Sequence, residues 1–481
     1  MAKTRHSVDL CIIGAGSGGL SIASGAAQLG RSVVLYERSE MGGDCLNSGC
    51  VPSKALIAAG KHAQAFRTGA PFGIEAAEPN VDFAAMQAHV KDVIATIAPI
   101  DSQERFEGMG CTVIRESARF SGPNEVQSDS YIVKAKRIII ATGSVASIPP
   151  IDGLDGVKYQ TNETIFDLEG QPKTLMILGA GPIGFELGQA FQRLGTAVHI
   201  IDLAEPLGKM EPEHARVLIE ALKSEGVTFH APAKTKSISQ RGKTITITFE
   251  DGQTLKGDCL LVATGRKPVT EGLDLDKAGI ETVKHGYIDT DDCLRTTNKS
   301  VYAVGDVSGK GGLTHAAGYH ASVIIKAFYF LPPLIARWKG KATTDRMPAS
   351  IYSQPELATI GVTENAAIEK FGADKVRCVS WDYADNDRAI AERHTGGGVK
   401  LVATKGGTLL GASIVGPQAG ELIHVVSAAM ANNIKISGLT GMISPYPTRG
   451  EAIKRAAGSW YTDKLFGPFG QFIAKTMSRF H

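Results

Sequence analysis

The chain lacks the features that mark membrane proteins and nucleic-acid-binding proteins. Its formal net charge is only +2 over 481 residues, so the whole-chain charge gives no reason to expect nucleic acid or an anionic membrane as a partner. The best candidate for a membrane span, "FYFLPPLIARW", is short and is interrupted by Pro332 and Pro333. No secretory signal is recognisable, because "MAKTRH" leads straight into the apolar run "VDLCIIGAG". We therefore expect a cytoplasmic protein without a membrane span.

Cysteine is also scarce, with seven residues in the whole chain. Cytoplasmic thiols are reduced by default, so a disulfide framework is not expected. Five cysteines are scattered, mostly in apolar contexts, and we predict that they are small core residues: Cys11, Cys111, Cys259, Cys293 and Cys378. The remaining two, Cys45 and Cys50, lie close together and need another explanation.

Glycine, by contrast, is abundant, with 55 residues that gather in short motifs. Apolar residues make up 43% of the chain and charged residues 21%, which is ordinary for a globular protein. A chain of this length is too long for one hydrophobic core, so two to four domains are expected.

Two glycine motifs follow the same plan. The first places Gly14, Gly16 and Gly19 between the apolar run "VDLCII" and a helix-like segment, and a second strand, "SVVLYE", ends at Glu37. The second copy, "TLMILGAGPIGFELGQAFQRLGTAVHIID", has Gly179, Gly181 and Gly184 and ends at Asp202. In both copies the acid lies eighteen positions after the last glycine. In such units the glycines admit a pyrophosphate and the acid binds a ribose hydroxyl. We therefore predict two dinucleotide sites.

The acid that ends the second motif, Asp202, indicates whether a nicotinamide cofactor bound there would be NAD(H) or NADP(H). A carboxylate at Asp202 would accept hydrogen bonds from a free ribose 2′-hydroxyl and would repel a 2′-phosphate. The segment "DLAEPLGKM" offers no arginine beside it. These points favour NAD(H), although Asp202 could also be a solvated strand end.

The segment "GGDCLNSGCVPSK" (42–54) holds the cysteine pair. It could be a structural disulfide, half of a metal site or a redox-active disulfide. On a regular helix, residues five apart have Cα atoms about 8–9 Å apart, whereas a disulfide needs about 4.4–6.8 Å. We therefore expect a break around Asn47, Ser48 and Gly49, with regular helix only from about Cys50. A zinc site is disfavoured by the spacing and by the lack of other Cys or His nearby in sequence.

An electron path from a nicotinamide to a disulfide usually needs a flavin, so the first glycine unit, beside the cysteines, should bind FAD.

At this point the sequence resembles the pyridine nucleotide–disulfide oxidoreductases, a family that includes dihydrolipoamide dehydrogenase, glutathione reductase and mercuric reductase. The resemblance runs from Val8 to about Lys464. It covers the cysteine segment, the two junction motifs "IIIATGS" (138–144) and "LLVATGRKP" (260–268), and a second flavin motif, "VYAVGDVSGKGGLTHAA" (301–317).

The resemblance implies roles for individual residues. Cys50 matches the charge-transfer thiol nearest the flavin, and Cys45 matches the interchange thiol that meets the acceptor. Lys54 matches a lysine near flavin N5, and Glu186 matches its carboxylate partner; a buried lysine needs such a counter-ion. Further residues in the matching motifs are expected to contact cofactor: Gly43, Thr142, Gly143, Gly265, Asp306, Thr314 and His315.

The family's architecture implies an α/β fold with two Rossmann-like, three-layer ββα nucleotide-binding domains and an α+β dimerisation domain. The expected divisions are an FAD domain (1–150), an NAD domain (151–274), a central segment returning to the FAD domain (275–345), a dimerisation domain (346–465) with strands "GVKLVA" and "LLGASIVG", and a tail (466–481). The apolar tail could pack on a partner subunit or fray.

The sequence departs from the family in one informative place. Disulfide-reducing members bring a His–Glu pair to the partner's interchange thiol, and the histidine is the general base. Here "ISPYPTRGEAIKRAA" keeps Glu451 but has Tyr446 at the histidine position. A tyrosine, with a pKa of about 10, is a poor base at neutral pH, although it could also be interface packing. Mercuric reductases carry a tyrosine here, but they also need a C-terminal cysteine pair, and no cysteine follows Cys378.

We therefore expect a homodimeric enzyme, with an active site shared across the interface. It should pass electrons from NADH through FAD to Cys45–Cys50 and on to a disulfide-type acceptor. Reduction of a metal ion, such as Hg or Cu, or of a quinone is the alternative, and a non-catalytic redox-sensing flavoprotein is a second alternative. Asp44, where many members have threonine, should raise the pKa of the Cys45 thiol beside it and repel anionic substrates.

Overall fold

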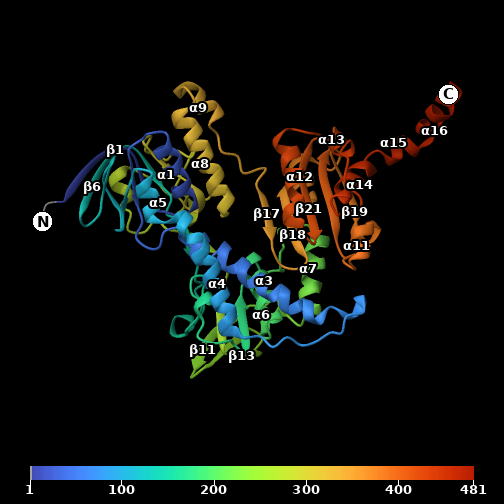
Figure 1. The fold of residues 1–481 in the computed structure, drawn as a ribbon, viewed down its shortest axis with the longest axis horizontal. Helices are drawn as coiled ribbons and strands as arrows, with labels where there is room; N and C mark the ends of the chain where they lie inside the picture. The colour runs from blue at the N-terminus through green and yellow to red at the C-terminus, as the bar shows by residue number, and fades with distance from the viewer. Residues whose placement is uncertain (1–2, 481) are drawn as a thin grey trace. The chain divides into compact units, whose positions relative to one another are not determined.

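The computed structural model describes residues 3–480. The chain forms two compact units. The first contains residues 1–203 and 229–344, and the second contains residues 204–228 and 345–481. Each is treated separately below (Figure 1).

The first unit begins with a seven-stranded sheet in the order β3-β2-β1-β6-β5-β4, with β16 pairing with β6. Strands β1, β2, β3, β6 and β16 run parallel to one another, and β5 and β4 extend the sheet from β6 as an antiparallel ribbon. The bounds are β1 (Thr4–Ile13), β2 (Val33–Tyr36), β3 (Cys111–Ile114), β4 (Arg119–Gly122), β5 (Glu125–Gln127), β6 (Tyr131–Ile140) and β16 (Val301–Ala303). The parallel strands are continuous apolar runs because helices and the ribbon cover both faces of the sheet.

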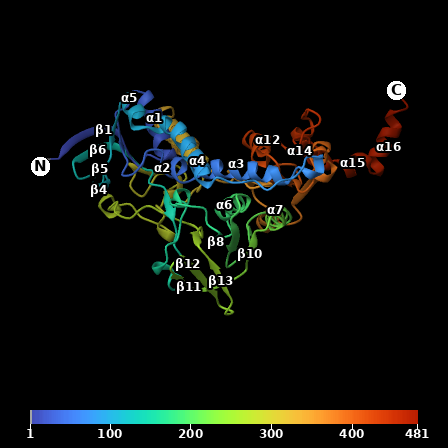
Figure 2. The same cartoon turned by 60° about the horizontal axis from the view of Figure 1, so that its bottom comes forward.

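Helices pack on this sheet and extend from it. α1 and α8 pack side by side, with Leu20, Ile22, Ala321 and Ile324 in one hydrophobic cluster with the sheet. The helices of this part are α1 (Ser17–Gln28), α2 (Gly43–Asn47), α3 (Cys50–Arg67), α4 (Phe83–Ile97), α5 (Gln103–Gly108), α8 (Thr314–Tyr329) and α9 (Pro333–Lys339). Figure 2 shows the length of α3, which leads away from the first sheet toward α6.

A second Rossmann-like region in the same unit repeats the arrangement of a parallel sheet covered on both faces. Its parallel sheet has the order β10-β9-β8-β14, and a three-stranded antiparallel sheet, β11-β12-β13, covers one face of it. The bounds are β8 (Thr174–Leu178), α6 (Pro182–Arg193), β9 (Ala197–Ile201), β10 (Thr228–His230), β11 (Thr235–Arg241), β12 (Thr244–Phe249), β13 (Thr254–Gly257) and β14 (Cys259–Val262). A short antiparallel pair, β7 (Ser144–Ala146) and β15 (Arg266–Pro268), joins the two layers.

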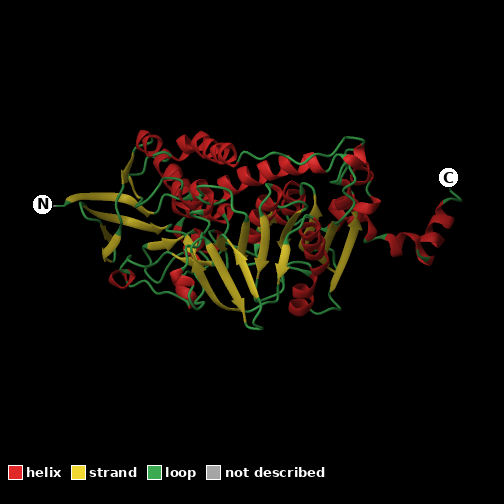
Figure 3. Cartoon of the chain, turned by 90° about the horizontal axis from the view of Figure 1, so that it is seen from below, coloured by secondary structure: helices red, strands yellow, loops and turns green. Residues whose placement is uncertain are grey.

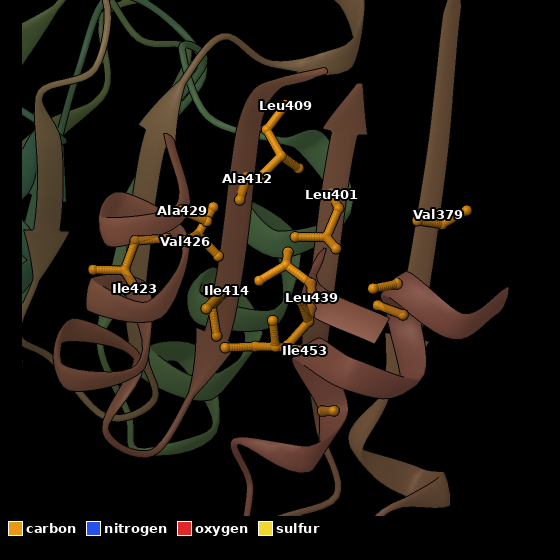
Figure 4. Packing of buried hydrophobic residues seen from close by; sticks show 14 of the residues in the cluster. Val379, Leu401, Leu409, Ala412, Ile414, Ile423, Val426, Ala429, Leu439 and Ile453 are labelled. Atoms are coloured by element: carbon orange, nitrogen blue, oxygen red, sulfur yellow. The ribbon is translucent and has the colours of Figure 1, made fainter. Parts of the chain in front are cut away.

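The second unit is an antiparallel five-stranded sheet with helices on both faces. Its strand order is β17-β18-β21-β20-β19. The elements are α7 (Pro212–Ser224), β17 (Pro348–Ile351), β18 (Glu356–Gly361), α10 (Glu364–Phe371), β19 (Val376–Asp382), α11 (Asp387–Ala391), β20 (Gly398–Thr404), β21 (Leu409–Gly416), α12 (Ala419–Ala431), α13 (Ile436–Thr440), α14 (Glu451–Ser459), α15 (Thr462–Phe466) and α16 (Pro468–Met477). Figure 4 shows its core, where Leu401 and Ile414 of the sheet meet Val426 of α12 and Ile453 of α14.

The expected fold class is confirmed: two parallel, three-layer regions are followed by an α+β region, and Figure 3 shows the mixture of strands and helices. The two strands expected in the last region are β20 and β21. The expectation for the scattered cysteines holds for Cys11, Cys111 and Cys259, which are buried. It is wrong for Cys293 and Cys378, which are partly exposed, Cys378 because it lies at the edge of a sheet in β19. Within residues 3–480, every helix is too short or too polar to cross a bilayer.

Candidate active site

The two glycine motifs adopt the same backbone geometry. Gly14 and Gly179 both have positive φ, at 107° and 117°, which side-chain-bearing residues rarely adopt. A Cβ on Gly14 would stand 2.4 Å from the carbonyl oxygen of Ala141, and one on Gly179 would stand 2.3 Å from that of Ala263. The first glycine of each motif is therefore required by the turn that leads from strand to helix.

The other glycines divide into packing and open positions. A Cβ on Gly19 would lie 1.9 Å from the Gly14 carbonyl oxygen, and one on Gly184 would lie 2.1 Å from that of Gly179. By contrast, a Cβ on Gly181 would meet no atom within 4 Å. This open approach to the backbone at the start of a helix suits a pyrophosphate, because the free N–H groups and the helix dipole favour negative charge there.

The strand-end acids occupy equivalent positions beside these turns. Glu37 Oε2 accepts a hydrogen bond from the N–H of Ala15 at 2.8 Å, and Asp202 Oδ2 accepts one from the N–H of Ala180 at 2.7 Å. Both carboxylates thus lie at the carboxyl edge of their sheet, next to the glycine turn, where a dinucleotide's ribose would lie.

The cysteine segment is broken where the spacing requires a break. Helix α2 ends at Asn47, and α3 begins at Cys50. Gly49 between them has φ −126° and ψ −112°, and a Cβ there would lie 2.8 Å from the Asp44 carbonyl oxygen. The distortion brings the two thiols into hydrogen-bond contact with each other, and both are reduced in the structure.

The surroundings of the thiols differentiate them. Cys50 Sγ lies 3.2 Å from Thr314 Oγ1. The hydrogen bond from Cys45, then that from Thr314 and the nearby Lys54, lower the pKa of Cys50 to about 6, against the opposing effects of burial and Asp44. Cys50 is also the first residue of an 18-residue helix, where the dipole favours a thiolate. The neighbouring thiol and burial raise the pKa of Cys45. The reduced pair therefore holds its negative charge on Cys50 and its proton on Cys45.

The lysine implied by the resemblance is paired as expected. Lys54 Nζ donates to Glu186 Oε2 at 2.8 Å, and the Glu186 side chain is only 8% exposed. The pair joins α3 to α6, which pack closely because Gly60 leaves room: a Cβ there would be 3.1 Å from the Cα of Ala190. The pair therefore holds a cation one helical turn beyond Cys50.

Asp44 is held in a network that the sequence reasoning did not include. Its carboxylate accepts from Ser48 Oγ at 2.8 Å, from Asn162 Nδ2 at 2.8 Å and from Arg266 Nη2 at 3.0 Å. The guanidinium of Arg266 offsets its charge, so Asp44 repels anions less than an isolated carboxylate would. The carboxylate raises the pKa of Cys50, as the last and smallest contribution, rather than that of Cys45, where the sequence had placed the effect.

The same arginine leads to the second flavin motif. Arg266 Nε donates to Ser144 Oγ at 2.7 Å, and that hydroxyl donates to Asp306 Oδ2 at 2.5 Å. Ser144 and Arg266 lie on the paired strands β7 and β15. Arg266 and Ser144 were missed from sequence, although both stand inside the two junction motifs that had been recognised. Arg266 thus links Asp44, next to Cys45, to Asp306, which is expected to bind cofactor.

The remaining expected cofactor residues lie around these turns. A Cβ on Gly43 would lie 2.8 Å from the Cα of Gly16, so the cysteine segment and the first glycine motif are in backbone contact. Thr142 donates to the carbonyl oxygen of Val269. The other three are Gly143 and Gly265, which both have positive φ, and His315, the second residue of α8 after Thr314.

The predicted second half of the site lies in the second unit. Tyr446 is 71% exposed, and its hydroxyl donates to Asp387 Oδ2 at 2.6 Å. Glu451 instead pairs with Arg455 at 2.8 Å. The hydrogen bond to Asp387 raises the pKa of Tyr446 above its ordinary value. The phenol is therefore a still poorer base than a free tyrosine.

These residues fit FAD and a nicotinamide dinucleotide. Each glycine motif carries an open backbone position and a strand-end carboxylate, and the first lies against the cysteine segment. Residues 3–480 hold no group of three or more His, Cys, Asp or Glu that could hold a metal ion.

Comparison with known proteins agrees with this geometry. The family profile described as "Pyridine nucleotide-disulphide oxidoreductase" matches residues 8–321, and the profile of that family's dimerisation domain matches residues 347–457. A mercuric reductase of Streptomyces lividans is 34% identical over 96% of this chain and 98% of its own length. The mitochondrial dihydrolipoyl dehydrogenase of Pisum sativum is 33% identical over 94% of this chain and 91% of its own.

Solved structures give the same result. The HOCl-induced flavoprotein disulfide reductase RclA of Escherichia coli, solved as a Cu(II) complex, superimposes with a TM-score of 0.83 at 26% identity, over 95% of this chain and all of that one. LpdA of Mycobacterium tuberculosis gives 0.83 at 26% identity, over 95% and 99% of the two chains. Two family profiles and relatives that match over nearly their full length leave one assignment: the chain belongs to the pyridine nucleotide–disulfide oxidoreductases, which use FAD and NAD(P)H.

Proposed function

We propose that the protein is an NADH-dependent, FAD-containing oxidoreductase that reduces the Cys45–Cys50 disulfide and passes the electrons to a disulfide-type acceptor. The observation that carries the proposal is the asymmetric thiol pair, with Cys50 beside Thr314 and the Lys54–Glu186 ion pair. We assign residues 1–150 and 275–345 to FAD binding, 151–274 to NAD binding and 346–465 to dimerisation.

When bound, the two cofactors supply a two-electron path from a hydride donor to the disulfide. The protein's own residues then determine where charge and proton reside. Two electrons and one proton break the S–S bond and give one thiolate and one thiol. The start of α3 and Lys54 favour the thiolate at Cys50, so Cys45 keeps the proton. Asp202, which repels a 2′-phosphate, supports NADH over NADPH.

The next step is an attack by Cys45 on the acceptor, and it needs a proton acceptor because the pKa of Cys45 is raised. We propose a homodimer in which Tyr446 and Glu451 of one subunit lie beside the thiols of the other. Tyr446, hydrogen-bonded to Asp387, is a poor base. Disulfide exchange should therefore be slow, because loss of a general base typically costs about 10²–10⁴ in rate.

That same observation favours a second candidate, reduction of a metal ion. A soft cation such as Hg(II) or Cu displaces the proton from a thiol by binding sulfur, so it needs no tyrosine or histidine base. The similarity to a mercuric reductase and to the Cu(II) complex of RclA supports this candidate.

Steady-state NADH oxidation with oxidised lipoamide, small disulfides, Hg(II), Cu(II) and a quinone tests the proposal. Turnover with disulfides or metal ions that is lost in Cys45→Ser, and kept in a control Cys293→Ser, supports a thiol route. Turnover with the quinone alone, unaffected by Cys45→Ser, contradicts it. No turnover with any acceptor, although NADH reduces the protein, would favour a redox-sensing flavoprotein.

A further inference from the structure

The C-terminal tail carries a run of large apolar side chains that the proposed function does not use. None of the residues of α15 and α16, all of them described, is buried. The exposed side chains share this chemistry, with exposed fractions from 44% to 79%: Leu465, Phe466, Phe469, Phe472, Ile473, Met477 and Phe480. Figures 1 and 2 show α15 and α16 leading away from α14 and from the sheet of the second unit. Lone exposed apolar residues are ordinary, but a contiguous set marks an interaction surface.

These side chains form one face of α16. Phe469, Phe472, Ile473 and Met477 occupy positions i, i+3, i+4 and i+8, which lie on one side of a helix. Lys475, at i+6, lies outside this stripe on the polar side of the helix. Its charge is therefore separated from the apolar face and stays in water.

The charges of α15 and α16 and the residues after them are mostly cationic. From residue 462 to residue 480 the sequence contains Lys464, Lys475 and Arg479 and one acid, Asp463, which pairs with Arg377 at 3.4 Å. The chain as a whole is nearly neutral, at +2, so this segment is a local cationic excess. An apolar face rich in phenylalanine, with cations in excess around it, is the pattern of a helix that lies in the plane of a membrane surface.

A second segment, in the first unit, repeats the same chemistry. Phe330, Leu334 and Trp338 at the end of α8 and in α9 are 64%, 83% and 74% exposed. The Lys339 ammonium lies 6.0 Å from the Trp338 ring centroid. Residues 330–344 contain no acidic residue. Tryptophan and phenylalanine with neighbouring lysine are the side chains enriched at lipid headgroup level.

The tail lies outside the matched dimerisation domain. That profile ends at residue 457, before α15 begins at Thr462. An excess of cations around an apolar face suits an anionic lipid surface, because such a surface attracts cations.

We propose that the tail, residues 465–480, is an interfacial anchor that binds the surface of an anionic lipid bilayer without crossing it, and that Leu334 and Trp338 of α9 form a second contact of the same kind. The apolar side chains enter the headgroup boundary, and Lys475 and Arg479 lie against lipid phosphates. The anchor is independent of the redox chemistry and confines it to a membrane surface.

Vesicle flotation of the full-length holoenzyme tests the proposal. The lipids are phosphatidylglycerol and phosphatidylcholine in equal parts, against phosphatidylcholine alone. We expect wild-type protein to float with the anionic vesicles and to dissociate as salt is raised. Phe469→Asp with Phe472→Asp should abolish flotation, and Leu334→Asp with Trp338→Asp should weaken it. NADH turnover should be unchanged in both.

A charge pair of variants provides the matched control. Lys475→Gln with Arg479→Gln should weaken binding to anionic vesicles about 25-fold, or about fivefold for each cation. Lys61→Gln with Lys405→Gln makes the same change in net charge at two exposed positions outside both segments and should have no effect. If both pairs weaken binding equally, the tail is not the site.

Two further results would overturn the proposal. One is wild-type protein that stays with the soluble fraction at low salt. The other is a change of subunit state, seen by analytical ultracentrifugation, in the Phe469→Asp/Phe472→Asp variant, since this would show that the tail packs on a second copy of the chain.

Discussion

The hydroxyl of Tyr446 donates to Asp387 Oδ2 at 2.6 Å, while Glu451 pairs with Arg455. The residue expected at the family's histidine position therefore has its own carboxylate partner, and the sequence does not show that partner. A phenol held in this way gives up its proton less readily than free tyrosine, so we expect it to be a poor base for Cys45.

Tyr446→Phe provides the first prediction. If the phenol takes no proton in turnover, its removal should leave lipoamide turnover within about a factor of two of the wild type, because base catalysis is worth about 10²–10⁴ where it operates. Tyr446→His should raise lipoamide turnover about 10-fold or more, since imidazole has a pKa of about 6.5. Cu(II) or Hg(II) reduction should not rise. A loss of about 10²-fold in Tyr446→Phe would show that the phenol takes part in proton transfer.

The second prediction concerns the two sulfurs. In the two-electron-reduced holoenzyme, the thiolate of Cys50 beside flavin should give a long-wavelength charge-transfer band. Because the pKa of Cys50 is lowered to about 6, the band should be present above pH 6 and lost as pH falls through that value. Cys45→Ala removes the hydrogen bond that lowers the pKa most, so the band should remain but disappear at a higher pH. Cys50→Ala should have no band at any pH, and identical behaviour of the two variants would refute the assignment.

The third prediction concerns a buried ion cluster in the second unit. Lys400, with a side chain 10% exposed, lies 3.1 Å from Glu211, 2.5 Å from Glu213 and 2.6 Å from Glu364. Burial alone would lower its pKa, but hydrogen bonds to the three carboxylates raise it. Lys400→Met would leave these carboxylates without a cation, so it should lower the free energy of unfolding by about 3–5 kcal/mol.

Denaturant unfolding measures this change, with Lys405→Met as a control at an exposed position. Equal effects of the two substitutions would show that the cluster contributes no specific stability.

The fourth prediction is a pH dependence of stability. Burial lowers the pKa of His214 to about 4, and its ring accepts or donates a 2.7 Å hydrogen bond with Ser413. The charge of Glu213 raises the pKa of His214, and the charge of Lys400 lowers it. Below its unfolded pKa of about 6.5, the unfolded chain binds a proton that the folded chain does not. Stability should therefore be full above pH 6.5 and fall as pH drops toward 4, by about 3 kcal/mol from this group.

His214→Asn should flatten that slope, whereas His424→Asn, at an exposed position, should not. Part of the slope should persist, because burial also lowers the pKa of His320. An unaltered slope in His214→Asn would contradict this origin.

The sequence predicted the fold class because each Rossmann unit carries its signal locally: an apolar strand, three glycines and a strand-end acid. The same is true of the break at Gly49, which follows from the geometry of a five-residue spacing. The sequence did not predict which residues contact each other over long separations in the chain. Arg266 reaches Asp44 across 222 positions, and Asp387 reaches Tyr446 across 59, and no periodicity or spacing encodes such contacts. The sequence also could not show whether the tail is exposed, because an apolar stripe on a helix has the same pattern whether or not another element covers it.

NADH should deliver electrons to the Cys45–Cys50 disulfide, and a count of reactive thiols in the denatured protein measures this. The protein is trapped in acid before and after anaerobic reduction by NADH. The chain has seven cysteines, and we expect five free thiols in the oxidised holoenzyme and seven after NADH. Cys50→Ala should give six in both states. A wild-type count that NADH leaves unchanged, at five or at seven, would show that NADH does not reduce this disulfide.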